Sequence, residues 1–177
     1  MSQNKYLIFA TLIFLAGCES MSVPQCQVAD WGRVGFSDGA AGVSESQLAN
    51  YTEDCAKAGV QPNAVAYRQG WDAGVLRFCT AANGWREGLQ GNSFKVAVCQ
   101  GQPGYEAFAQ YLDAGLRLHR TREHMRQNSL EINRLQKHLE ETTSDAEKHR
   151  LREQLHGIDH EQVRLRGVMS LQQLAAP

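Results

Sequence analysis

Four acidic residues in the N-terminal half of the chain could act as acid or base groups. Asp30, Asp38, Asp72 and Glu87 lie among aromatic residues, and burial beside an aromatic core would raise a carboxyl pKa toward the range useful for proton transfer. Acidic residues are also typical of helix caps and glycine-rich turns, and Asp30 directly precedes an expected helix. We favour the structural role and predict no catalytic residue.

Nucleophilic and metal chemistry lack their usual residue patterns. No serine lies in a nucleophile elbow, and the first histidine is His119, so a hydrolase would have no histidine base in the first half. His156 and His160 are four residues apart, a spacing that could hold a metal on one helical face. Solvent-facing histidines are the commoner case, so we predict no metal and no cofactor.

Aromatic residues offer a second kind of site, a pocket for a small ligand or substrate. In this alternative the aromatic side chains line the pocket, and Asp38 or Glu87 orients the ligand. The aromatic residues of the predicted pocket are Trp31, Tyr67, Trp71 and Trp85.

The composition indicates a folded protein without a polyanionic partner. The 177 residues are 42% hydrophobic and 21% charged, an ordinary globular mixture. Eighteen Lys and Arg against 19 Asp and Glu give a net charge of −1, which argues against nucleic-acid binding.

The N-terminus has the pattern of an export signal. Lys5 is followed by an apolar run over residues 6–14, too short to cross a bilayer of about 30 Å. The next residues, Leu15-Ala16-Gly17-Cys18, resemble the bacterial lipoprotein box, in which the cysteine is lipidated and becomes the new N-terminus. We therefore expect a signal peptide at 1–17 and a lipidated tether at 18–25. The alternative is a plain secretory signal in which Cys18 is incidental.

The residue after the lipidation site bears on location. Glu19 stands where an inner-membrane retention signal would have Asp. We expect a protein anchored by lipid in the outer membrane and facing the periplasm.

The remaining cysteines fit an oxidising compartment. Cys26, Cys55, Cys79 and Cys99 form an even set, so two disulfides are expected. A metal site is the alternative, but no Cys-x-x-Cys pair occurs. If residues 28–42 and 46–58 form antiparallel helices, Cys26 lies beside Cys55, which favours Cys26–Cys55 and Cys79–Cys99 among the three possible connectivities.

The region 26–104 is rich in glycine and aromatic residues. Three segments share two glycines four residues apart with an aromatic residue after the first: 35–39, 70–74 and 84–88. On a helix such glycines lie on one face and allow another backbone to approach closely. Turns are the alternative, above all at Asn83-Gly84. We predict a compact, disulfide-stapled helical domain.

The region 105–177 has the heptad spacing of a coiled coil. A first seam contains Ala107, Tyr111, Ala114, Leu118, Met125, Ile132, Leu135 and Leu139. A second seam, out of phase with the first, contains Leu151, Leu155, Ile158, Leu165 and Met169. A break is therefore required, and residues 142–145 supply it, with Ser144 and Glu147 in a capping-box pattern. We predict an antiparallel coiled-coil hairpin, and all-α as the class of the whole chain.

Several of these motifs together resemble one family over residues 26–116. They are Asp30-Trp31, Gly35, Asp38-Gly39, Gly42, Cys55-Ala56, Tyr67, Gly70, Gly74, Phe78-Cys79-Thr80, Asn83-Gly84, Gly88, Gly91 and Cys99. The pattern resembles DUF2799, a family of bacterial envelope lipoproteins of unknown function. The chain departs from it at Gly32, where an aromatic residue is expected, and after Cys99, where proline is expected. The resemblance implies location and architecture, and no activity.

The sequence therefore leaves two classes of function. In the first, which we favour, the protein is structural or interacts with other proteins, and region 105–177 is an arm for an envelope protein, a second copy or the cell wall. In the second, the aromatic residues of region 26–104 bind or hydrolyse a small molecule.

Overall fold

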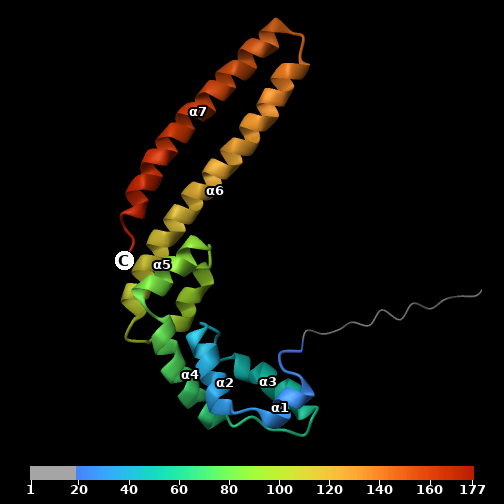
Figure 1. Cartoon of the computed structure of the whole chain (residues 1–177), viewed down its shortest axis with the longest axis vertical. Coiled ribbons are helices and arrows are strands. Elements are labelled where there is room, and N and C mark those ends of the chain that lie inside the picture. The colour runs from blue at the N-terminus through green and yellow to red at the C-terminus, as the bar shows by residue number, and fades with distance from the viewer. Residues whose placement is uncertain (1–18) are drawn as a thin grey trace, which may run out of the picture.

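The structure, a computed structural model, describes residues 19–177 and contains only helices and connections over that range (Figure 1). The predicted all-α class is confirmed. The expected signal peptide and Cys18 lie outside the described residues.

Seven α-helices and one 3-10 helix follow one another along the described chain. They are α1 (Val23–Val28), α2 (Trp31–Ala40), α3 (Gln47–Ala56), α4 (Ala64–Phe78), α5 (Ala81–Leu89), η1 (Ser93–Cys99), α6 (Tyr105–Glu141) and α7 (Asp145–Gln173). Polar caps start four of them: Asp30 accepts from the Arg33 amide at 3.1 Å, and Asn63, Thr80 and Ser144 cap α4, α5 and α7 in the same way. The capping role expected of Asp30 is thus observed.

Helices α2 and α4 pack backbone against backbone. Glycines on the facing sides remove the side chains that would separate them: Gly35, Gly39, Gly70 and Gly74. A methyl group on Gly39 would lie 2.4 Å from the Trp71 carbonyl oxygen, and one on Gly74 would lie 2.2 Å from that of Phe36. Both distances are too short for a carbon–oxygen contact, so these positions require glycine.

Helices α5 and α6 make the same kind of contact. A methyl group on Gly88 would lie 2.3 Å from the Leu112 carbonyl oxygen, and one on Gly115 would lie 2.5 Å from that of Trp85. Gly84 faces the Phe108 carbonyl oxygen in the same way, at 2.3 Å. The helical interpretation of the 84–88 segment is therefore the correct one.

The two helix pairs are copies of one arrangement. In both, a segment Gly-aromatic-x-acid-Gly-x-x-Gly crosses a second helix, at 35–42 in the first pair and at 84–91 in the second. The glycine that ends each segment has a positive φ, 65° at Gly42 and 83° at Gly91, and lies against a ring, Phe78 or His119. We call residues 23–78 the first unit and residues 79–119 the second unit.

The disulfides also follow this duplication. Cys26–Cys55 joins α1, ahead of α2, to the connection between α2 and α4. Cys79–Cys99 joins the residue ahead of α5 to the connection between α5 and α6. The predicted disulfides and their pairing are present, but the reasoning for the first was wrong: α2 packs on α4, and it is α1 that lies against α3.

The C-terminal region is an antiparallel pair of long helices, α6 with 37 residues and α7 with 29 (Figure 1). They turn at 142–144, as predicted. Ser144 accepts from the Glu147 amide at 3.4 Å, whereas the Glu147 carboxylate accepts from the Thr142 hydroxyl at 3.1 Å. Only half of the predicted capping box therefore forms.

The expected seam residues differ in burial. Leu118, Leu135, Leu151 and Leu165 are buried. Ala107 is exposed, because this end of α6 faces α5 rather than α7.

Helix α6 lies entirely in the region predicted as the hairpin, 105–177, but the structure divides it between the compact part and the hairpin. Its first turns complete the second unit, and the remainder forms the hairpin with α7. The compact part therefore spans residues 23–119 and the hairpin residues 120–173.

Candidate functional site

Asp38 in α2 is the centre of the polar contacts in the first unit. Its carboxylate accepts hydrogen bonds from the Tyr67 hydroxyl at 2.7 Å and from the Tyr51 hydroxyl at 3.4 Å. Tyr67 is 0% exposed and Tyr51 8%. The tyrosine rings meet edge to face with centroids 6.1 Å apart, and Trp31 stands 6.2 Å from Tyr51. The site is thus one carboxylate bonded by two tyrosine hydroxyls, and both tyrosine rings belong to a cluster with Trp31.

The electrostatics keep both phenols protonated. Burial first, and then the neighbouring Asp38 carboxylate, raise the pKa of Tyr51 to about 12. The same two causes raise the pKa of Tyr67 further. Because each phenol is a donor to Asp38 only in its neutral form, neither phenol is available as a base near neutral pH.

The predicted pocket residues divide between the two units. Trp71 is 7% exposed and donates from its indole nitrogen to the Val43 carbonyl at 2.8 Å, so it packs inside the first unit. Trp85 and Glu87 lie on α5 in the second unit, and the buried Glu87 carboxylate accepts from the Asn92 side-chain amide at 2.8 Å. The structure therefore brings together Trp31, Asp38 and Tyr67 but not the complete predicted set.

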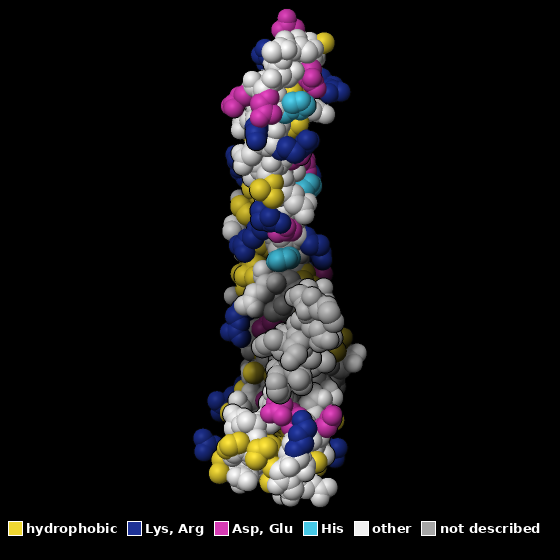
Figure 2. Space-filling view, turned by 90° about the vertical axis from the view of Figure 1, so that its right-hand side faces the viewer, with side chains coloured by type: hydrophobic (Ala, Val, Ile, Leu, Met, Phe, Trp, Pro, Cys, Tyr) yellow, Lys and Arg dark blue, Asp and Glu magenta, His cyan; other side chains and the backbone are white. Residues whose placement is uncertain are grey.

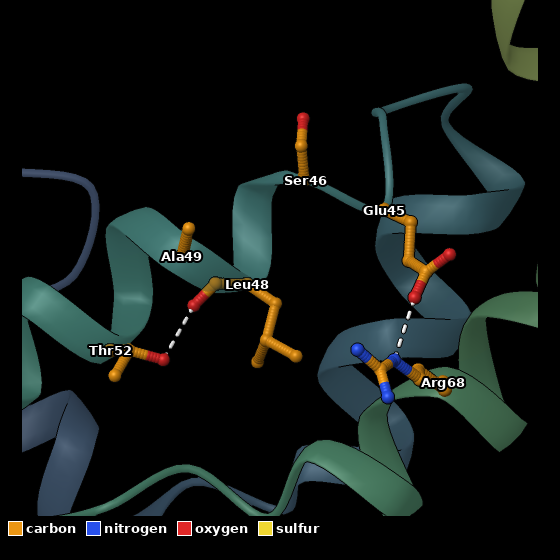
Figure 3. Close-up of a pocket in the computed structure, with 6 residues that line it drawn as sticks. All are labelled: Glu45, Ser46, Leu48, Ala49, Thr52 and Arg68. Carbon is orange, nitrogen blue, oxygen red and sulfur yellow. Dashed lines mark hydrogen bonds and ion pairs between the residues drawn. The ribbon is translucent and has the colours of Figure 1, made fainter.

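A groove opens on the surface of the first unit, between α3 and the start of α4 (Figure 3). It is lined by Glu45, Ser46, Leu48, Ala49, Thr52 and Arg68. The Arg68 guanidinium and the Glu45 carboxylate form an ion pair at 2.8 Å across one side of it. The groove forms where the α2–α3 connection, α3 and α4 come together, so no local sequence motif indicated it. The two charges already neutralise each other, and the groove is open to solvent.

Tyr51 was missed from the sequence. It lies four residues before Cys55 on α3, and so on the same helical face as a residue expected to be buried. That spacing was the available signal.

The described residues show no metal centre of three or more ligands: no group of three His, Cys, Asp or Glu side chains is gathered between residues 19 and 177. Of the two remaining acidic candidates, Asp30 caps α2 and Asp72 is exposed on α4. His156 and His160 lie together on the outer side of α7.

The hairpin presents a mixed, charged surface (Figure 2). Ion pairs run along each helix, among them Arg126–Glu123, Arg134–Glu131 and Arg164–Glu161. Large apolar side chains are exposed between them: Leu130 at 56%, Val163 at 64%, Leu171 at 71%. The helix contact itself contains a buried polar residue, Gln162, whose amide donates to the Met125 carbonyl at 3.0 Å.

The N-terminal segment is attached to α3 by charge and hydrogen bonds. The Ser20 amide and hydroxyl both donate to the Asp54 carboxylate at 2.7 Å, and Glu19 pairs with Lys57 at 3.6 Å. Donation from Lys57 and Ser20 holds the pKa of the Asp54 carboxyl well below its usual range. The residues that follow the expected lipidation site are therefore fixed to the compact part. Among the described helices, none is long and apolar enough to cross a membrane.

These features define an all-α protein with a duplicated, glycine-packed and disulfide-stapled compact part that is extended by a helical hairpin. Residues 30–117 match the family described as a protein of unknown function (DUF2799), and the chain belongs to this family. No curated protein and no solved structure matches the chain. The matched range covers almost all of the compact part and ends near where the hairpin begins.

Proposed function

We propose that the protein is an outer-membrane lipoprotein of the periplasmic side, and that its hairpin is an interaction arm for another envelope protein. The observation that carries the proposal is the extent of the hairpin. Helix α6 continues for 24 residues past the end of the family match at 117, to Glu141, and α7 returns along it. The compact part does not need this length for its own core.

The position of the tether supports the arm. The segment that follows Cys18 is bonded to α3, at one end of the elongated molecule, and the hairpin turn lies at the opposite end (Figure 1). If lipid is attached at Cys18, the compact part stands at the membrane and the turn is directed away from it. The part of α6 that lies in the hairpin, residues 120–141, gives a reach of about 33 Å beyond the compact part.

The surface of the arm supports a protein partner. Val163, at 64% exposure, and Leu171, at 71%, offer apolar area on the arm that a protein partner would remove from water. The balanced charges of the whole chain give no attraction to a polyanion.

Photo-crosslinking in living cells tests the proposal. A crosslinking amino acid is placed at the exposed Arg152 or Arg126 of the hairpin, and for comparison at the exposed Arg33 of the compact part. We expect one dominant protein adduct from the hairpin positions and none from Arg33. Adducts of equal yield from all three positions, or none at normal expression, would contradict the interaction arm.

An in-register shortening of the hairpin is the matched variant. Removing residues 125–138 and 149–162 deletes two heptads from each helix, about 21 Å of length, and keeps the turn and the compact part. Gln162 and its partner Met125 are removed together. Because the deletion also removes Arg126 and Arg152, the crosslinking amino acid is placed for this comparison at the exposed Arg166, which both chains keep. We expect this variant to fold and to lose the adduct. Palmitate labelling, abolished by Cys18→Ala, tests the lipid anchor separately.

A further inference from the structure

Two histidines on the outer side of α7 are arranged as a chelating pair. His156 and His160 are one helical turn apart, and their Nε2 atoms are 3.2 Å from each other. Both side chains are exposed. The two rings stand nearly perpendicular, with an interplanar angle of 88° and centroids 4.4 Å apart.

The separation of the two nitrogens fits a shared metal ion. With metal–nitrogen bonds of about 2.0–2.1 Å, two nitrogens 3.2 Å apart subtend an angle of about 103° at the metal. That angle lies between the octahedral and tetrahedral values. Because the rings are exposed, they can turn their lone pairs to the common point without disturbing the packing of α7 on α6.

An acidic residue lies beside the two histidines, although no described group of three His, Cys, Asp or Glu side chains is gathered closely enough to hold an ion. A hollow on the surface of α7 is lined by His156, Asp159, His160 and Val163. The nearby Glu161 carboxylate is already bonded to Arg164 at 2.7 Å, whereas Asp159 shares the hollow with the two imidazoles. Water would fill the remaining coordination positions.

We propose that His156 and His160 bind one divalent transition-metal cation, with Asp159 beside it. Neutral imidazoles favour Cu²⁺, Ni²⁺ and Zn²⁺ over Mg²⁺ and Ca²⁺, and two imidazoles bind Cu²⁺ most tightly of these. The site is open, and it lies on the arm rather than in the compact part. It is independent of the proposed interaction function.

Titration calorimetry of the full chain, prepared without a histidine tag, tests the proposal with CuSO₄, NiCl₂ and ZnCl₂ as probes. We expect one Cu²⁺ per chain with micromolar affinity, and weaker binding of Ni²⁺ and Zn²⁺. His156→Ala and His160→Ala should each weaken Cu²⁺ binding roughly tenfold or more, because either change destroys the chelate. Both variants should keep the helix, since alanine is the strongest helix former.

His149→Ala is the matched control, because His149 is an exposed histidine on the same helix. We expect it to leave the affinity unchanged. The electron paramagnetic resonance spectrum of the Cu²⁺ complex should show two equatorial nitrogens, and one or none in either variant. No binding at 0.1 mM Cu²⁺, or an equal loss of affinity in His149→Ala, would overturn the proposal.

Discussion

Glycine lies at the helix contacts of the compact part, whereas Gly157 and Gly167 in α7 have no neighbouring atom within 4 Å of an added methyl group. In the compact part a glycine allows two backbones to touch, and the contact compensates for the poor helix propensity of the residue. In the hairpin nothing compensates for it. The same residue is thus a requirement of packing in one region and a weak point in the other.

The largest expected effect is at the glycine contacts. Gly39→Ala places a methyl group 2.4 Å from the Trp71 carbonyl, so α2 and α4 must separate. We expect a loss of about 3 kcal/mol in the free energy of unfolding, at the upper end of the cost of overpacking. Urea denaturation measures it. Gly88→Ala should behave alike, and an unchanged midpoint in both would refute the backbone packing of the two units.

Tyr67 and Phe108 occupy equivalent positions in the two units, because Gly35 faces the Tyr67 carbonyl as Gly84 faces that of Phe108. Tyr67→Phe therefore makes the first unit resemble the second. The change removes the 2.7 Å hydrogen bond to Asp38 from a fully buried site. We expect a loss of about 2 kcal/mol, as is usual for a bond to a charged acceptor. Tyr51→Phe, whose bond is 3.4 Å long, should cost less. Equal losses would show that the carboxylate is not held mainly by Tyr67.

Alkaline pH should weaken the first unit. The pKa of Tyr51 is raised to about 12 in the folded chain, above that of an unfolded tyrosine near 10. Its contribution is therefore present in full below about pH 10 and is lost as the pH rises toward 12. The free energy of unfolding, measured from pH 8 to 11.5 with intact disulfides, should fall above pH 10. The fall should be smaller in Tyr51→Phe.

The smallest effect has the opposite sign. Gly157→Ala adds a methyl group in open space on α7, so only helix propensity changes. We expect a gain of up to about 1 kcal/mol, seen as a higher melting temperature of the hairpin by circular dichroism. A loss of stability would mean that this face of α7 is covered in solution.

The sequence predicted features that depend on neighbours along the chain. The heptads and the break at 142–145 led to the hairpin, and the paired glycines led to close helix contacts. It did not predict that α2 packs on α4, since a glycine face indicates that a backbone approaches but not which one. The same limit explains Ala107, which has seam spacing but lies where α6 faces α5.

The candidate site shows a similar division. Asp38 and Tyr67 were expected near each other, but the second phenol, Tyr51, comes from α3, whose place depends on the disulfide to Cys26. Trp85 and Glu87 share the motif of the first unit and yet belong to its copy. Residues from both copies of the repeated segment were therefore assigned to one pocket, although the copies lie in two separate units.

Because α6 is one continuous helix, a force applied to the hairpin would be transmitted directly to the compact part. One uninterrupted helix runs from the α5 contact to the turn of the hairpin. A lateral force at the turn is thus carried to the contact of Gly88 with Gly115, where no flexible side chain intervenes to absorb it. A load on the arm would be borne by the backbone of the second unit and by Cys79–Cys99 beside it.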